Sequence, residues 1–279
     1  MKLTVLVDNN TYIDKYFYGE PAVSYFIEDE GKTILYDVGY SEAFILNSHK
    51  LNINLLKLNY LIFSHGHLDH TWGLDPLLRM YMEAATGGVE VIKPKIVAHP
   101  KTFFYRPRTW LGGSGSLVSE ERVSNYFEIQ KSNEPVWLTE KLVWLGNIPK
   151  SNGFELKKPF KKIKIGSEEV DDYMEDEVAL AYKGNKGLFI ISACSHRGIC
   201  NIIEYAKRIC KEDRIFDVIG GFHLMDPEKE LLDKTVQYFS DINPTNLHAC
   251  HCTDLKSKIA LSKVANLQEV GVGLSLEYK

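Results

Sequence analysis

The stretch Ser64–His70 concentrates side chains that bind metal ions. It reads Ser-His-Gly-His-Leu-Asp-His, which places four potential ligands within six residues. These ligands are His65, His67, Asp69 and His70. Imidazole and carboxylate ligands suit zinc, which is our first expectation, and also iron and manganese. Because histidine is scarce elsewhere in the chain, a chance surface cluster is a poor explanation, and the motif predicts one or two divalent metal ions.

The motif lies between a predicted buried strand and a predicted amphipathic helix. Residues 58–63 are mostly apolar and precede it directly. After it, apolar residues recur at helical spacing, at Leu74, Leu77, Leu78, Tyr81 and Met82. In an extended loop, side chains two residues apart point the same way, so His65 and His67 can bind one ion. Asp69 and His70 follow at the helix start and can face a second point nearby.

The segment His65-x-His67-x-Asp69-His70 after a hydrophobic strand resembles the signature of the metallo-β-lactamase superfamily. The earlier segment Asp37–Gly39 resembles that superfamily's second-strand motif. The resemblance covers most of the chain and implies an α/β fold, the αβ/βα four-layer sandwich, with a metal site at the sheet edges. It also implies that the first two histidines bind one metal and that Asp69 and His70 bind a second.

Three motifs in the second half of the chain narrow this resemblance. They are Ala193–Ile199, Gly220–Leu224 and His251–Thr253. They resemble the branch named for the dihydropterin ribofuranosylaminobenzene phosphate synthase of methanopterin biosynthesis, although Asp254 stands where a glycine is expected. The resemblance implies that His251 binds the second metal.

The predicted strand at 187–194 departs from the superfamily pattern. Where most members carry a bridging aspartate, this chain has Cys194 or His196. We expect His196 to be the ligand, because an imidazole reaches farther than a thiol and binds metal without first losing a proton. The superfamily also has a histidine upstream of this strand, whereas here no histidine lies between residues 100 and 195. Asp172 or Asp176 could replace that ligand.

Two residues are candidates for direct contact with a substrate. His223 follows a predicted strand and a pair of glycines, and could donate a proton or a hydrogen bond. Arg197 lies at an expected helix N-terminus, which favours anions, so it is a candidate phosphate-binding residue. Asp69 is expected to take part in catalysis as well as in metal binding.

The pattern of elements predicts one α/β domain over residues 1–279, with an insertion or small subdomain at about 100–165. Strands are also expected near 2–8, 21–28, 32–37, 178–183, 187–194, 215–220 and 245–252, and helices near 41–49, 198–211, 228–240 and 254–264. The insertion carries the glycine–serine loop 112–116, and we expect it to form one wall of the substrate pocket.

Composition limits the classes of partner. The formal net charge of −4 gives no general attraction to nucleic acid. The sequence contains no apolar run long enough to span a membrane. We expect no signal peptide, because Asp8 comes too early for the apolar region of one. The five cysteines, an odd number, all follow residue 193, which favours a reducing cytoplasm over a disulfide framework. We therefore expect a cytoplasmic protein with a small-molecule substrate and no nucleic-acid or membrane partner.

Together these features predict a metal-dependent hydrolase. A metal-activated water would attack a small metabolite, either phosphorylated or ester-bearing. Two alternatives stay open. The first is the methanopterin-pathway synthase itself, a group-transfer enzyme, and the second is a non-catalytic metal-binding protein that uses the same fold.

Overall fold

The computed structural model describes residues 1–108 and 112–279 and divides the chain into two compact units. The first unit contains residues 1–132, 161–171 and 271–278, and the second contains 133–160, 172–270 and 279. Each unit is built on its own β-sheet. Across the described ranges, no helix combines the length and the apolar character needed to cross a membrane.

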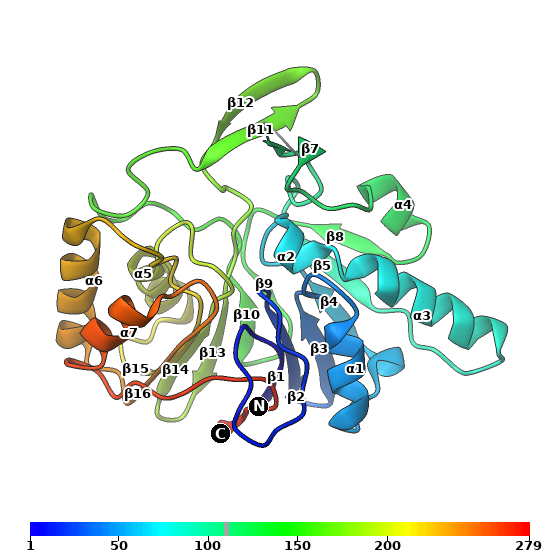
Figure 1. The fold of residues 1–279 in the computed structure, drawn as a ribbon, viewed down its shortest axis with the longest axis horizontal. Coiled ribbons are helices and arrows are strands. Elements are labelled where there is room, and N and C mark those ends of the chain that lie inside the picture. Colours follow the sequence, from blue (N-terminus) through cyan, green and yellow to red (C-terminus); the bar gives the residue numbers. More distant parts are fainter. Residues whose placement is uncertain (109–111) are drawn as a thin grey trace. The chain divides into compact units, whose positions relative to one another are not determined.

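The first unit is built on a mixed sheet with the strand order β17-β1-β2-β3-β4-β5-β8 (Figure 1). Its strands are β1 (Lys2–Val7), β2 (Ser24–Asp29), β3 (Lys32–Tyr36), β4 (Tyr60–Ile62), β5 (Lys95–Ala98), β8 (Ile129–Lys131) and β17 (Ser275–Glu277). Because β3, β4, β5 and β8 are parallel neighbours, their carboxyl ends lie at one edge of the sheet. This edge carries the residues that follow β3 and β4.

The helical segments of the first unit cover this sheet and its edge. They are α1 (Ala43–Lys50), the 3₁₀ turn η1 (Leu55–Lys57), α2 (Leu68–Thr71), α3 (Leu74–Thr86) and α4 (Glu120–Ser124). Two short antiparallel pairs complete the description, β6 (Pro107–Arg108) with β7 (Gly112–Gly113), and β11 (Lys161–Ile165) with β12 (Glu168–Asp172).

The apolar stripe predicted for the helix after the metal motif is mostly confirmed in α3. Leu74 and Leu77 are fully buried, and Leu78 and Tyr81 nearly so, in the core over the sheet. Each such side chain stabilises the fold by about 1.5–3 kcal/mol relative to exposure. Met82, which was expected in the same stripe, is instead 51% exposed. The helix therefore presents an apolar residue outward.

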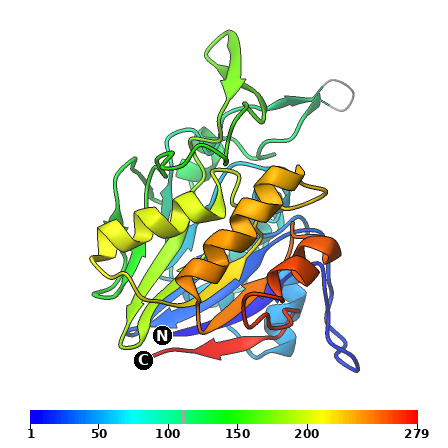
Figure 2. The same cartoon turned by 90° about the vertical axis from the view of Figure 1, so that its left-hand side faces the viewer.

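The second unit is built on a sheet with the strand order β16-β15-β14-β13-β10-β9. Its strands are β9 (Val136–Trp137), β10 (Leu142–Trp144), β13 (Leu180–Gly184), β14 (Gly187–Ile191), β15 (Ile215–Gly220) and β16 (Asn246–Ala249). Its helices are α5 (Ile199–Cys210), α6 (Lys229–Ile242) and α7 (Leu255–Leu261), and Figure 2 shows α5 (yellow) and α6 (orange) lying over the strands. Since β14, β15 and β16 are parallel, their carboxyl ends also share one edge.

The segment at about 100–165, expected as an insertion, contributes strands to both sheets. Its β8 pairs with β5 in the first unit, whereas its β9 and β10 extend the sheet of the second. The β11–β12 hairpin returns to the first unit up to residue 171. The segment is therefore shared between the two sheets.

Candidate functional site

The predicted ligands His65, His67, Asp69 and His70 form one group in the first unit, which we call the histidine cluster. The chain leaves β4 at Ile62 and turns into α2, for which His67 is the N-terminal cap. His65 and His70 are fully buried, and His67 is 7% exposed. Nε2 of His65 lies 3.0 Å from Nδ1 of His67, and the ring centroids of His65 and His70 are 4.2 Å apart.

Asp37 orients this cluster from the neighbouring strand. It follows Tyr36, which pairs with Ile62 of β4, so the two strand ends lie side by side. One carboxylate oxygen of Asp37 accepts a hydrogen bond from the Ser64 amide at 2.7 Å, and the other accepts from the Ser64 hydroxyl at 2.6 Å. The second oxygen also lies 2.7 Å from Nδ1 of His70. A proton held on Nδ1 makes Nε2 the atom that can bind a metal.

The electrostatics of the cluster favour a cation. Nε2 of His70 lies 3.4 Å from Oδ2 of Asp69. Burial lowers the pKa of His70, but the carboxylates of Asp69 and Asp37 outweigh burial and raise this pKa to about 10. The site thus stabilises a positive charge between two carboxylates, and a divalent cation supplies that charge when the imidazole is neutral. The donor set fits a divalent metal ion.

Gly66 is closely covered by the segment that follows β5. A Cβ atom at this position would lie 2.0 Å from the Thr102 carbonyl oxygen and 2.5 Å from a guanidinium nitrogen of the buried Arg106. Nearby, the Trp72 indole donates a hydrogen bond of 2.8 Å to the carbonyl of Gly115, in the glycine–serine loop. The first part of the 100–165 segment therefore packs against the metal motif. That this segment forms one wall of the substrate pocket stays a prediction.

The substitution Gly66→Ala is expected to lower both stability and metal content. The added methyl group cannot fit between the cluster and the backbone at Thr102, and such overpacking costs about 1–3 kcal/mol. Thermal unfolding and metal analysis would measure the two effects. Gly153→Ala is the matched control, since a Cβ there meets no atom within 4 Å. Equal stability of the two variants would contradict the expectation.

A second group of candidate ligands lies at the carboxyl edge of the sheet in the second unit. Sγ of Cys194, which follows β14, is 3.2 Å from Nε2 of His251, which follows β16. The Cys194 sulfur also lies within 4.8 Å of a ring nitrogen of His196. Cys194 is thus the neighbour of both histidines. The distances favour Cys194 over His196 as the companion of His251, which is the opposite of the order expected from sequence.

His223 joins this group from the end of β15. Its ring centroid is 4.2 Å from that of His196, and Phe160 packs edge-on against both rings, at 5.5 and 4.7 Å. His223 and His251 have left-handed backbone conformations, with φ of 50° and 47°. Such conformations are uncommon for residues other than glycine, and they cluster at functional sites.

Glu177 holds the loop that carries His196, a role that was missed in the sequence. Its two carboxylate oxygens accept hydrogen bonds from the backbone amides of His196, at 2.6 Å, and Arg197. Burial raises the pKa of Glu177 to about 8, although the two amide bonds oppose this. Seven acidic residues crowd residues 168–177, so nothing local marked this carboxylate as different from its neighbours.

We expect Glu177→Ala to loosen the Cys194–Arg197 loop. Two buried amides would lose their partner, and each unsatisfied group costs about 1–3 kcal/mol. Hydrogen exchange at the amides of His196 and Arg197 would report the effect directly, and Glu175→Ala, an exposed neighbour, serves as control. Unchanged protection of these two amides would rule out this role for Glu177.

Arg197, the predicted phosphate contact, is engaged within the protein. Its guanidinium donates to the backbone carbonyls of Ile148, at 2.6 and 2.9 Å, and Tyr173, at 3.0 Å. The N-terminus of α5, where phosphate binding was considered, holds the carboxylate of Glu155, which accepts from the amides of Cys200 and Asn201 at 3.0 and 2.9 Å. This arrangement favours a structural role for the arginine.

Asp172 and Asp176, the two acidic alternatives, are both buried. Asp172 is buried and accepts a hydrogen bond of 2.8 Å from the Met174 amide, and Asp176 is fully buried nearby in the sequence. His99 accepts from the Lys101 amide at 3.0 Å in the turn after β5. No disulfide links the five cysteines, all of which lie in the described part of the chain and are buried.

Comparison with known proteins supports the same family. Residues 18–147 match the model of the metallo-β-lactamase superfamily. An archaeal relative from Methanocaldococcus jannaschii, named 7,8-dihydropterin-6-methyl-4-(β-D-ribofuranosyl)-aminobenzene-5′-phosphate synthase, is 30% identical over 92% of this chain and 89% of its own. An uncharacterized protein of the same organism is 28% identical over 97% of this chain and 98% of its own.

A solved structure confirms the expected fold. A metal-dependent hydrolase of the β-lactamase superfamily superposes with a TM-score of 0.83 at 24% identity, covering 99% of this chain and 98% of the other. The mixed sheets with helices thus form the α/β fold of this superfamily. The sequence matches and the fold together show that the chain belongs to the metallo-β-lactamase superfamily, in the branch of the dihydropterin ribofuranosylaminobenzene phosphate synthase-like proteins.

Proposed function

We propose that this protein is a metal-dependent hydrolase that acts on a small metabolite. The observation that carries the proposal is the histidine cluster, in which the Asp37 carboxylate lies 2.7 Å from Nδ1 of His70 and so presents Nε2 as a ligand atom. A divalent cation bound there would polarise the substrate and activate a water molecule. Zinc is the first candidate, because the imidazole and carboxylate donors of the cluster suit it.

The candidate ligands are those predicted from the sequence. They are His65, His67, Asp69 and His70 of the histidine cluster, together with His196 and His251 of the second unit. In place of His196 we favour Cys194, because its sulfur lies 3.2 Å from Nε2 of His251. Which of the two binds metal is tested by the cobalt experiment described in the Discussion.

The chain's own residues then have distinct parts in the reaction. Asp37 fixes the tautomer and orientation of His70, and Asp69 adds a carboxylate beside Nε2 of that histidine. His223 is the proposed donor of a proton or hydrogen bond to the substrate, held by ring contacts with His196 and Phe160. We do not propose Arg197 as a phosphate contact, because its guanidinium donates hydrogen bonds to the backbone carbonyls of Ile148 and Tyr173.

A second function, group transfer by the synthase of this branch, is favoured by one observation. The relative that is 30% identical over 92% of the chain is named as that synthase. In such a reaction the two precursors would be joined, and no water would enter the product. The same metal site could assist the departure of the leaving group.

One pair of assays separates these functions. The metal-loaded protein would be incubated with panels of esters, lactones and phosphodiesters, and separately with the pterin and ribofuranosylaminobenzene precursors, with products identified by mass spectrometry. Hydrolysis of a panel member, absent in His67→Ala, supports the hydrolase. Formation of the joined adduct supports the synthase. Bound metal with neither product would favour a non-catalytic binding protein and contradict both.

A further inference from the structure

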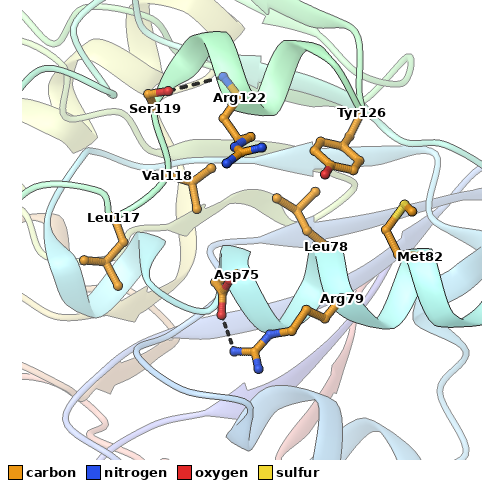
Figure 3. Close-up of a pocket in the computed structure, with 9 residues that line it drawn as sticks. All are labelled: Asp75, Leu78, Arg79, Met82, Leu117, Val118, Ser119, Arg122 and Tyr126. Carbon is orange, nitrogen blue, oxygen red and sulfur yellow. Dashed lines mark hydrogen bonds and ion pairs between the residues drawn. The ribbon is translucent and has the colours of Figure 1, made fainter.

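A cavity lies in the first unit, and none of its lining residues belongs to the histidine cluster. It has a volume of about 600 Å³ and opens between α3 and residues 117–126, which contain α4 (Figure 3). Cavities that hold small molecules commonly measure about 300–1,000 Å³. The size of this cavity therefore fits a small organic ligand.

One side of the cavity is apolar and open to solvent. Leu78 and Met82 line it from α3, and Leu117 and Val118 line it from the facing segment. Leu117 is 63% exposed and Met82 is 51% exposed, although both are large apolar side chains. Their exposure is costly unless something apolar covers them. Met82 was predicted to be buried, and a ligand bound in this cavity would cover it and so explain its exposure.

The other side of the cavity carries one uncompensated positive charge. Figure 3 shows Arg122 extending from α4 toward α3, over Leu78. Within residues 1–108 and 112–279, no acidic side chain forms an ion pair with the Arg122 guanidinium. The second arginine of the cavity, Arg79, is paired with Asp75 one helical turn away. The cavity therefore presents a net single positive charge beside an apolar surface.

We propose that this cavity binds a small amphipathic anion. The anionic group, a carboxylate or a phosphate, would be bound by the planar guanidinium of Arg122, which can donate two parallel hydrogen bonds to either. The apolar body of the ligand would cover Leu78, Met82 and Leu117, and the Tyr126 ring lies at the side of the cavity to pack against it. This site is separate from the proposed metal site and does not depend on it.

Fluorescence titration of the full chain with anilinonaphthalene sulfonate, an amphipathic anion, tests the proposal. We expect saturable binding of one dye molecule per chain, displaced by octanoate and by octyl phosphate but not by octanol. The relative potency of octanoate and octyl phosphate distinguishes the two kinds of anionic group. Arg122→Gln should weaken dye binding about tenfold, the effect of losing one charge-assisted interaction. Leu117→Asp should weaken it further, because it places an anion among the apolar contacts.

Two controls keep the result interpretable. Lys256→Gln removes the same charge from an exposed helix of the second unit and should bind the dye like the parent chain. Near-ultraviolet circular dichroism would confirm that each variant keeps its tertiary packing, since molten-globule states also bind this dye. Displacement by octanol as effective as by octanoate, or unchanged binding in Arg122→Gln, would overturn the proposal. The titration is done with metal-free and metal-loaded protein, so that its outcome is independent of the proposed catalytic function.

Discussion

Replacing His67 or His70 by alanine is expected to remove most bound metal and all hydrolytic or transfer activity. Both rings belong to the histidine cluster, and in metal sites even the loss of a residue that only orients a ligand costs about 10–100-fold in affinity. Loss of a ligand should cost at least as much. Metal content after dialysis, measured by elemental analysis, reports the effect without any knowledge of the substrate.

The two variants differ in their expected effect on stability. The His67 side chain makes no capping hydrogen bond to the short helix α2 that it precedes, so its loss should leave the fold intact. His70 is fully buried against Asp37, so alanine there leaves a buried carboxylate with one partner fewer, at a cost of about 1–3 kcal/mol. His70→Asn keeps a polar side chain at this position and should retain more stability. Full metal content in both alanine variants, with His49→Ala as the exposed control, would refute the site.

Substituting Cys194 by serine should remove the near-ultraviolet absorption that a thiolate ligand gives with cobalt(II). The expectation rests on geometry, because the Cys194 sulfur is 3.2 Å from Nε2 of His251, and thiolates are strong ligands for soft and borderline metals. His196→Ala should keep the absorption band. Loss of a residue that only orients a ligand lowers metal affinity by about 10–100-fold. Loss of a ligand itself should cost at least as much, so we expect the affinity of the serine variant to fall at least about tenfold.

The cobalt experiment also decides whether Cys194 or His196 is the metal ligand. Cys210→Ser, a buried cysteine at the end of α5, is the matched control and should keep both the band and the metal. Metal binding without a charge-transfer band in the parent protein would show that sulfur is not a ligand. Loss of metal in His196→Ala, together with retention in Cys194→Ser, would restore the assignment expected from sequence.

Most of the regular structure could be predicted because it is encoded locally. The apolar spacing of α3 and of α5, the apolar strand β14 and the mostly apolar strand β15 extend over enough residues to identify each element. The short strands β9, β10 and β17 could not be predicted in this way. Three residues such as Ser275–Glu277 carry no pattern, and this strand exists because it pairs with β1 from the other end of the sequence.

The histidine cluster could be predicted for the same local reason. Its four candidate ligands lie within six residues at a strand end, so the chain itself places them near one another, and Asp37 follows the neighbouring parallel strand. The family resemblance rested on these motifs and was confirmed by relatives that cover most of the chain. Local spacing, together with the rule that parallel strands end at one edge, was sufficient for this part of the site.

The tertiary structure alone decided which side chains meet when they are far apart in the sequence. Cys194 and His251 are separated by 57 positions, and strand alternation could not choose between Cys194 and His196. In the sequence, Glu177 is one of seven acidic residues, and only the fold shows that its carboxylate accepts hydrogen bonds from two backbone amides. Arg197 was a candidate anion contact, but in the fold its guanidinium donates to backbone carbonyls. Met82 followed the helical period, yet it is 51% exposed. Sequence period determines which face a residue occupies, whereas the neighbour that buries it or bonds to it depends on how distant segments pack.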